Sequence, residues 1–175
     1  MQLSEILKGV ELANVLLVDV EVKNIQFDSR KVENGSMFVA TRGTAVDGHM
    51  YITNAVEAGA IVVVCEEMPS EMAENVIYLR VDNSAEALGR MASNYYGRPS
   101  EKLTLVGVTG TNGKTTIATL LYQLHRALGY KVGLLSTVCN YVDDKAIEST
   151  HTTPDALALN ALLSEMVEVG CQYAF

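Results

Sequence analysis

The sequence predicts an α/β protein with a small mixed α/β domain first, followed by the start of a parallel-sheet domain. Short runs rich in Val and Ile alternate with segments of helical periodicity, which is typical of parallel sheets. A polar connector, RPSEK at 98–102, interrupts this pattern and marks a boundary between residues 1–98 and residues 99–175. Beyond it, the segment GVTGTNGKTT at 107–116 joins a strand-like run to a helical one.

In the first domain, helices and strands alternate along the chain. The expected elements are a short helix after Ser4, extended runs between 20 and 41 divided by the turn DSRKVENGS, a helix over 50–59, strands at 60–65 and 76–81, and a helix from Asn83 to Gly97. Asn83 followed by Glu86 resembles a capping box, and glycine ends both longer helices. The triplet Asp47-Gly48-His49 predicts a turn that carries a surface histidine.

The second domain begins as a strand–loop–helix–strand unit. The expected elements are a strand over 103–109, a helix over 115–128 with apolar residues at 117, 120, 121, 124 and 128, a strand over 131–137, and a helix from Pro154 to Gly170 with Thr153 as N-cap. The final residues, CQYAF, have the pattern of a buried strand. A domain rarely ends on entry to such a strand, so we expect a fragment of a longer protein.

Composition narrows the class of protein. Hydrophobic residues make up 49% of the 175 residues and charged residues 19%, as in ordinary globular proteins. The net charge of −8 argues against a nucleic-acid binder, which needs an excess of Lys and Arg. Cys65, Cys139 and Cys171 share no metal-ligand spacing and indicate reduced thiols. With no signal peptide and no apolar run of transmembrane length, we expect a cytoplasmic protein without membrane insertion.

The segment 107–116 carries the clearest chemistry. Glycines between a strand and a helix let backbone N–H groups approach phosphates, and the helix N-terminus favours an anion. Lys114 would reach the β- and γ-phosphates of ATP, and the Thr115 hydroxyl would ligate Mg²⁺; these are the two candidate catalytic residues. The predicted ATP-binding residues are Gly110, Thr111, Asn112, Gly113, Lys114, Thr115 and Thr116.

The loop alone leaves alternatives open. A glycine-rich turn with a lysine at a helix start would look similar, and Val108 stands where the general P-loop has its first glycine. A true phosphate loop permits kinase, GTPase, motor or ligase chemistry. The Asn-Lys-x-Asp segment with which GTPases read the base does not occur in these 175 residues.

The loop resembles the ATP loop of the Mur ligase family, which departs from the general P-loop in the same way. Phe27-Asp28-Ser29-Arg30, followed by VENGSMFVATRGTAVDGHMYITNAVEAGA, resembles the uridine-nucleotide-binding N-terminal domain of the tripeptide and pentapeptide ligases (MurE and MurF). The segment HTTPD at 151–155 resembles the segment of the MurE branch on which the sugar nucleotide rests. Together the three motifs cover almost the whole chain.

The resemblance implies a set of substrate contacts. The residues that would bind the UDP-muramoyl peptide are Phe27, Ser29, Thr44, Ala45, Val46, Thr152 and Thr153. Many members have a polar triplet with a histidine where this chain has Thr44-Ala45-Val46, so backbone contacts are expected there. Taken without the family, the segment 28–30 would be a solvated Asx-type turn, and Thr152 and Thr153 would cap a helix.

The resemblance also implies a reaction of peptidoglycan precursor synthesis. ATP and Mg²⁺ would activate the D-glutamate carboxylate of UDP-N-acetylmuramoyl-L-alanyl-D-glutamate as an acyl phosphate, which the amine of meso-diaminopimelate or L-lysine attacks. In this family a Mg²⁺-binding Glu and a carbamylated Lys follow the region matched here. Residues 1–175 on their own should therefore have negligible ligase activity. A monomer is expected.

Three alternatives to the MurE branch are a MurF-type ligase, another ligase of the superfamily such as a folylpolyglutamate synthetase, and a non-catalytic nucleotide-binding module. The uridine-binding first half argues against the folylpolyglutamate synthetase, and HTTPD argues against MurF. A non-catalytic module would bind ATP without any dependence on a UDP-sugar.

Overall fold

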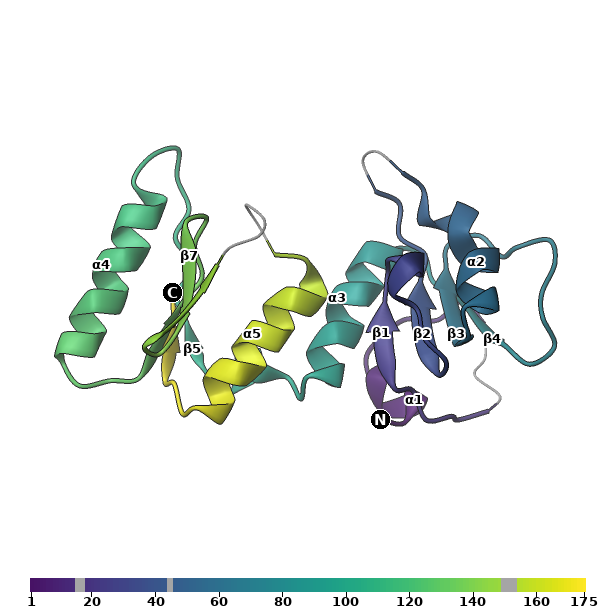
Figure 1. The fold of residues 1–175 in the computed structure, drawn as a ribbon, viewed down its shortest axis with the longest axis horizontal. Coiled ribbons are helices and arrows are strands. Elements are labelled where there is room, and N and C mark those ends of the chain that lie inside the picture. The colour runs from purple at the N-terminus through teal and green to yellow at the C-terminus, as the bar shows by residue number, and fades with distance from the viewer. Residues whose placement is uncertain (15–17, 44–45, 149–153) are drawn as a thin grey trace. The chain divides into compact units, whose positions relative to one another are not determined.

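The computed structural model describes residues 1–14, 18–43, 46–148 and 154–175. They form two compact units, Met1–Tyr95 and Tyr96–Phe175 (Figure 1). Each unit consists of a sheet with helices packed on it, so the predicted α/β class is confirmed. Among the described residues, no helix has both the length and the apolar character needed to cross a bilayer.

The first unit is built on a parallel sheet. Its elements are α1 (Leu3–Ile6), β1 (Asn24–Gln26), the 3-10 helix η1 (Ser29–Lys31), β2 (Ser36–Val39), the 3-10 helix η2 (Gly48–Tyr51), α2 (Ile52–Glu57), β3 (Ala60–Cys65), β4 (Ile77–Arg80) and α3 (Ser84–Tyr95). The strand order is β1-β2-β3-β4, and every neighbouring pair is parallel. Val62, Val63 and Val64 of β3 are fully buried, as expected for a central strand covered on both faces.

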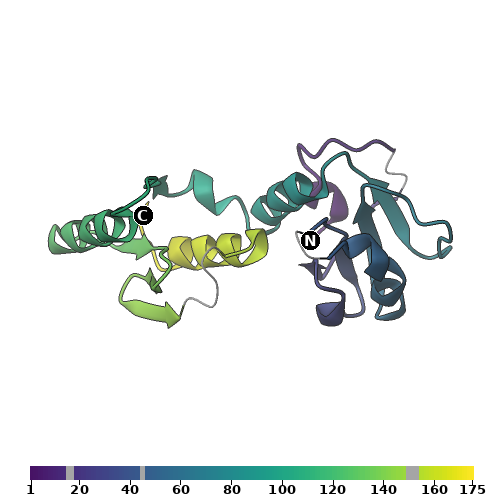
Figure 2. The same ribbon diagram turned by 90° about the horizontal axis from the view of Figure 1, so that it is seen from above.

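Local signals in the first unit place the ends of its helices. The Asn83 side chain accepts a hydrogen bond from the backbone N–H of Glu86 at 3.0 Å, which confirms the expected cap at the start of α3. Gly59, with φ +105°, and Gly97, with φ +73°, follow α2 and α3 in the backbone region that favours glycine. Figure 2 shows the same elements from above.

The second unit has a mixed sheet. Its elements are the 3-10 helix η3 (Pro99–Glu101), β5 (Thr104–Leu105), α4 (Lys114–Ala127), β6 (Val132–Leu134), β7 (Cys139–Val142), β8 (Lys145–Glu148), α5 (Ala156–Glu168) and β9 (Tyr173–Ala174). The strand order is β5-β9-β6-β7-β8. The expected parallel sheet is formed by β5, β9 and β6, whereas β7 and β8 add an antiparallel hairpin at one edge.

The two helices of the second unit cover opposite faces of this sheet. Successive residues of a strand point to opposite faces, and in β6 Val132 and Leu134 pack in one cluster with Ala118 and Tyr122 of α4. The intervening Gly133 faces α5, where an added Cβ would lie 2.2 Å from the sulfur of Met166. Helices on both faces bury β6, whereas β5 at the sheet edge is exposed.

Three predicted boundaries in the second unit are wrong. The strand expected over 131–137 ends at Leu134. The strand expected over 103–109 is limited to Thr104–Leu105, because the backbone from Gly107 onward turns into the loop. The helix expected from Pro154 begins at Ala156, because Asp155 is the N-cap and its carboxylate accepts a hydrogen bond from Ala158 N at 2.8 Å. Thr153, the expected cap, lies outside the described residues.

Gly59 provides a test of the first unit. A Cβ at this position would lie 2.8 Å from Asn34 Cα, and the positive φ adds strain, so Gly59→Ala should lower the free energy of unfolding by about 1–3 kcal/mol. The matched control is Gly89→Ala within α3, where an added Cβ meets nothing within 4 Å. Alanine favours a helix over glycine there and should raise stability by about 0.5–1 kcal/mol. Urea denaturation followed by circular dichroism measures both; equal effects would contradict the packing at Gly59.

Candidate functional site

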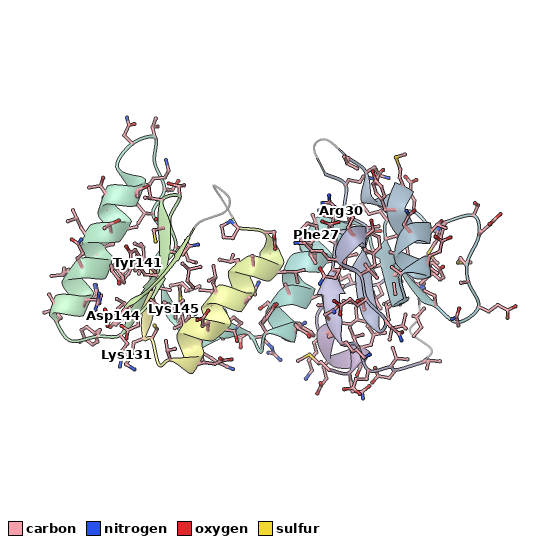
Figure 3. All side chains as sticks on the ribbon, viewed as in Figure 1. Phe27, Arg30, Lys131, Tyr141, Asp144 and Lys145 are labelled. Carbon is pink, nitrogen blue, oxygen red and sulfur yellow. The ribbon has the colours of Figure 1, made fainter. Side chains whose placement is uncertain are left out.

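A pocket of about 570 Å³ lies in the first unit, where the segments after β1 and β2 meet. Because these strands are parallel, their carboxyl ends lie at the same edge of the sheet. The lining residues are Phe27, Asp28, Ser29, Arg30, Phe38, Thr41, Gly43, Val46, Gly48 and Tyr51. Figure 3 shows Phe27 and Arg30 at the same end of this unit. The lining combines aromatic rings with hydroxyl groups and one guanidinium, a composition suited to a base and its polar substituents.

Asp28 and Arg30 form a local ion pair at this pocket. The Asp28 carboxylate accepts hydrogen bonds from Arg30 Nε at 2.9 Å, from Arg30 Nη2 at 2.8 Å and from Arg30 N at 3.1 Å. The side-chain hydrogen bonds of Arg30 are the main reason that the pKa of Asp28 falls to about 2. Arg30 itself is 86% exposed, so the pair holds a cation at the pocket that a charged ligand can reach.

The structure brings together three of the predicted uridine-binding residues. Phe27 and Ser29 are half-buried, Val46 is 52% exposed, and all three line the pocket. Thr44 and Ala45 lie outside the described residues. Sequence reasoning missed Thr41 and Tyr51, which line the same pocket. The position of Thr41 just beyond β2 was an available signal, whereas Tyr51 arrives through η2 and no local pattern marks it.

The expectation of a surface histidine at position 49 is wrong. The His49 side chain is only 11% exposed. Its Nδ1 lies 2.6 Å from Asp47 Oδ1, and its Nε2 accepts a hydrogen bond from Glu66 N at 2.9 Å. The turn itself is present, since Asp47 caps η2. The contact of His49 with Glu66 joins residues 17 positions apart in the sequence, so a three-residue motif cannot reveal it.

The second unit contains the predicted phosphate loop between β5 and α4. Gly110, with φ +149°, and Gly113, with φ +81°, adopt backbone conformations that glycine tolerates best. Lys114 is the first residue of α4, and its ammonium group folds over the loop to donate to Gly110 O at 2.6 Å and Thr111 O at 3.4 Å. Asn112 and Thr116 are exposed on the same segment.

The start of α4 supplies further donors for an anion. The first hydrogen bond of this helical turn is donated by Ile117 N to Gly113 O at 2.9 Å. Helix geometry therefore directs the N–H groups of residues 114–116 out of the helix end, where the helix dipole also favours negative charge. These donors, the two glycines and the lysine fit the phosphates of a nucleotide.

A pocket of about 320 Å³ adjoins this helix end. It is lined by Val106, Gly107, Val108, Lys114, Thr115, Ala118, Leu135, Ser136, Thr137, Pro154, Leu159 and Phe175. Sequence reasoning missed Ser136 and Thr137, although they lie at the carboxyl end of a predicted strand, where ligands bind in open α/β sheets. The Ser136 hydroxyl donates to Cys139 O at 2.7 Å, which fixes the turn beneath the pocket.

The candidate metal ligand is Thr115, which is half-buried beside Lys114. Within the described residues, no group of three or more His, Cys, Asp or Glu side chains could hold a metal ion. Mg²⁺ keeps several waters and commonly takes its remaining ligands from one or two protein groups and from substrate phosphates. A single hydroxyl at the helix start therefore fits an ion that arrives with the nucleotide. Thr152 and Thr153 lie outside the described residues.

In comparisons with known proteins, both units match models of the family that the sequence motifs resemble. The model of the Mur ligase family, catalytic domain, matches residues 21–96, and that of the Mur ligase middle domain matches residues 108–175. The UDP-N-acetylmuramoyl-L-alanyl-D-glutamate–2,6-diaminopimelate ligase of Parabacteroides distasonis is 56% identical over 176 residues, which cover 100% of this chain and 36% of that protein. The ligase of the same name from Clostridium tetani is 41% identical, with 99% and 36% covered. The chain thus spans about a third of the length of these relatives.

Solved structures of Mur ligases are also similar to this chain. A UDP-N-acetylmuramoyl-L-alanyl-D-glutamate–2,6-diaminopimelate ligase matches with a TM-score of 0.71 and 25% identity over 91% of this chain and 33% of that one. A MurF ligase from Thermotoga maritima in complex with ADP matches with a TM-score of 0.56 and 25% identity, over 87% and 31%.

The Asp28–Arg30 pair predicts a pH dependence of stability. Because the folded-state pKa of Asp28 is about 2, below its ordinary value, the pair stabilises the fold above pH about 4 and loses this effect as the pH falls towards 2. Asp28→Asn keeps a capping oxygen but removes the charge, and should lower stability at pH 6 by about 0.5–1 kcal/mol, since water screens the exposed Arg30. Urea titrations at pH 6, 4 and 2.5 should show that the difference in free energy of unfolding between wild type and Asp28→Asn shrinks as the pH falls. A difference independent of pH would contradict this assignment.

Proposed function

Because this chain belongs to the Mur ligase family, we propose that it forms the nucleotide-binding part of a ligase that joins a diamino acid to UDP-N-acetylmuramoyl-L-alanyl-D-glutamate. The relatives at 41–56% identity carry the name of the 2,6-diaminopimelate ligase, which supports diaminopimelate over L-lysine. The higher TM-score with a ligase of that name, 0.71 against 0.56 for the MurF ligase, supports the tripeptide branch.

The observation that carries the proposal is the loop–helix junction at Lys114. Its ammonium group and the outward N–H groups of residues 114–116 converge on one helix end. In the proposed reaction a substrate carboxylate must approach the phosphates of ATP, and two anions repel each other unless positive charge is placed between them. Lys114 would supply that charge, and Thr115 would hold Mg²⁺. ATP, when bound, would supply the phosphoryl group that activates the carboxylate.

The first unit would hold the other substrate by its nucleotide end. Phe27 and Val46 offer apolar walls for a uracil ring, Ser29 offers a hydroxyl, and Arg30 offers a cation for the diphosphate. Thr152 and Thr153 would contact the muramoyl peptide. The three cysteines are free in the structure, which supports our further proposal of a location in the reducing cytoplasm. We also propose that the protein acts as a monomer.

Removing the Lys114 ammonium tests the ATP site. Lys114→Ala should weaken binding of ATP in the presence of Mg²⁺ by about tenfold to a hundredfold, because hydrogen bonds to charged groups contribute about 1.5–3 kcal/mol. Isothermal titration calorimetry on the 175-residue chain gives the dissociation constant. Lys145→Ala is the matched control, since it removes the same charge from β8, where Lys145 pairs with Glu165. Equal ATP affinity of wild type and Lys114→Ala would refute the proposed site.

A thermal-shift panel distinguishes the ligase part from other nucleotide-binding proteins. UDP-N-acetylmuramoyl-L-alanyl-D-glutamate should raise the melting temperature more than the corresponding tripeptide nucleotide, and ATP with Mg²⁺ should also stabilise the chain, because a ligand that binds the folded state shifts unfolding. A MurF-type protein would prefer the tripeptide nucleotide. A non-catalytic nucleotide-binding module would respond to ATP and ignore both UDP-sugars.

A further inference from the structure

A polar network lies at the root of the loop that forms part of the first-unit pocket. The root network consists of Arg42, Asp47, His49, Glu66, Glu67 and Ser84. We infer that His49 is a positioning residue for this pocket: it fastens the described loop residues, 41–43 and 46–48, to the end of β3 and so sets the wall that a uridine nucleotide contacts. The inference rests on the proposed function, because that function supplies the ligand.

The loop closes on itself at two levels. Gly48 N donates to Thr41 O at 2.9 Å, and Gly43 N donates to Val46 O at 3.0 Å. A Cβ at position 48 would lie 2.7 Å from Thr41 O, so only glycine lets the two ends of the loop approach this closely. Thr41, Gly43, Val46 and Gly48 all line the pocket. The position of the loop root therefore decides the position of one wall.

His49 connects this root to β3 through both ring nitrogens. Nε2 accepts hydrogen bonds from Glu66 N at 2.9 Å and Glu67 N at 3.4 Å, so it carries no proton. The proton of the neutral ring is then on Nδ1, which donates to Asp47 Oδ1 at 2.6 Å. Asp47 Oδ1 also accepts from His49 N at 2.9 Å. One neutral imidazole thus spans the gap between the loop and the strand.

The charged members of the network hold the same segments together. The Arg42 guanidinium pairs with Glu67 and lies 3.2 Å from Glu66 Oε2 and 4.0 Å from Asp47 Oδ2, so one cation contacts three carboxylates. Glu66 Oε1 accepts hydrogen bonds from Ser84 N and Ser84 Oγ, each at 2.9 Å. The loop is thereby tied to the end of β3 and to the first residue of α3.

His49 acts on the pocket through the loop, since it is not among the described residues that line the pocket. Removing its ring leaves the N–H groups of Glu66 and Glu67 without this acceptor and releases one of the two ties of the loop root to β3. The tie through Arg42 stays, so the unit can still fold. We therefore expect loss of uridine-nucleotide affinity with ATP affinity intact, because the ATP loop belongs to the other unit.

Three substitutions separate the roles of the two ring nitrogens. In His49→Gln the amide oxygen can take the place of Nε2 as the acceptor for Glu66 N, whereas His49→Asn keeps a donor near Asp47 and loses that acceptor. His49→Ala loses both. Calorimetry on the 175-residue chain with UDP-N-acetylmuramoyl-L-alanyl-D-glutamate should show His49→Gln within about twofold of wild type, and His49→Asn and His49→Ala weaker by about three- to tenfold.

ATP, titrated into each variant, should bind as it does to wild type. His125→Gln is the matched control, because His125 packs against Tyr173 and Phe175 in the second unit. If His49→Ala does not fold, the comparison of His49→Gln with His49→Asn decides. If His49→Asn binds the UDP-sugar as tightly as wild type does, the inference about His49 is wrong and the proposed function stands. The same holds if the weakened variants lose ATP binding in parallel. Wild type that binds no UDP-sugar overturns the proposed function and this inference with it.

Discussion

Parallel pairing of short buried strands is the constraint on which both sites depend. It brings the carboxyl ends of β1, β2 and β3 to one edge of the first sheet, and those of β5, β9 and β6 to one edge of the second. The central strands are apolar and covered, as in Val63 and Val132, and most residues that line the two pockets come from the segments that follow the strands. Ligand-binding groups therefore gather at these edges without any further arrangement of the chain.

Under the proposed function, the two edges would attract anions by different means in a protein of net charge −8. In the second unit the donors belong to the backbone and the helix end, with Lys114 as the only side-chain cation at the described loop. Such donors suit the phosphates of a nucleotide. In the first unit, Arg30 is held by Asp28 next to aromatic walls, so charge and shape act together. For a bound anion, donors at contact distance would outweigh the more distant negative charges of the protein, because electrostatic attraction falls with distance.

Features encoded by neighbouring residues could be predicted, and features that depend on distant residues could not. The loop and α4 followed from glycines, Lys-Thr and helical spacing within about twenty residues, and the Asn83 cap from a four-residue pattern. The start of α5 was wrong because Thr153 and Asp155 both suit an N-cap, and sequence gives no preference between them. The contact of His49 with Glu66 and the membership of β7 and β8 in the sheet were missed, since each needs a partner that only the fold supplies.

Under the proposed function, recognition of the UDP-sugar belongs to the first unit. The loop at 107–116 would bind phosphates, which every nucleoside triphosphate shares. The pocket of the first unit is shaped by side chains of several elements, and its wall of Thr41, Gly43, Val46 and Gly48 depends on the root network for its position. That wall includes Val46, and the described residues that line the pocket contain no histidine. The wall and its anchor are therefore separate features. Side chains such as Val46 set what the pocket offers a ligand, and the root network sets where the wall lies.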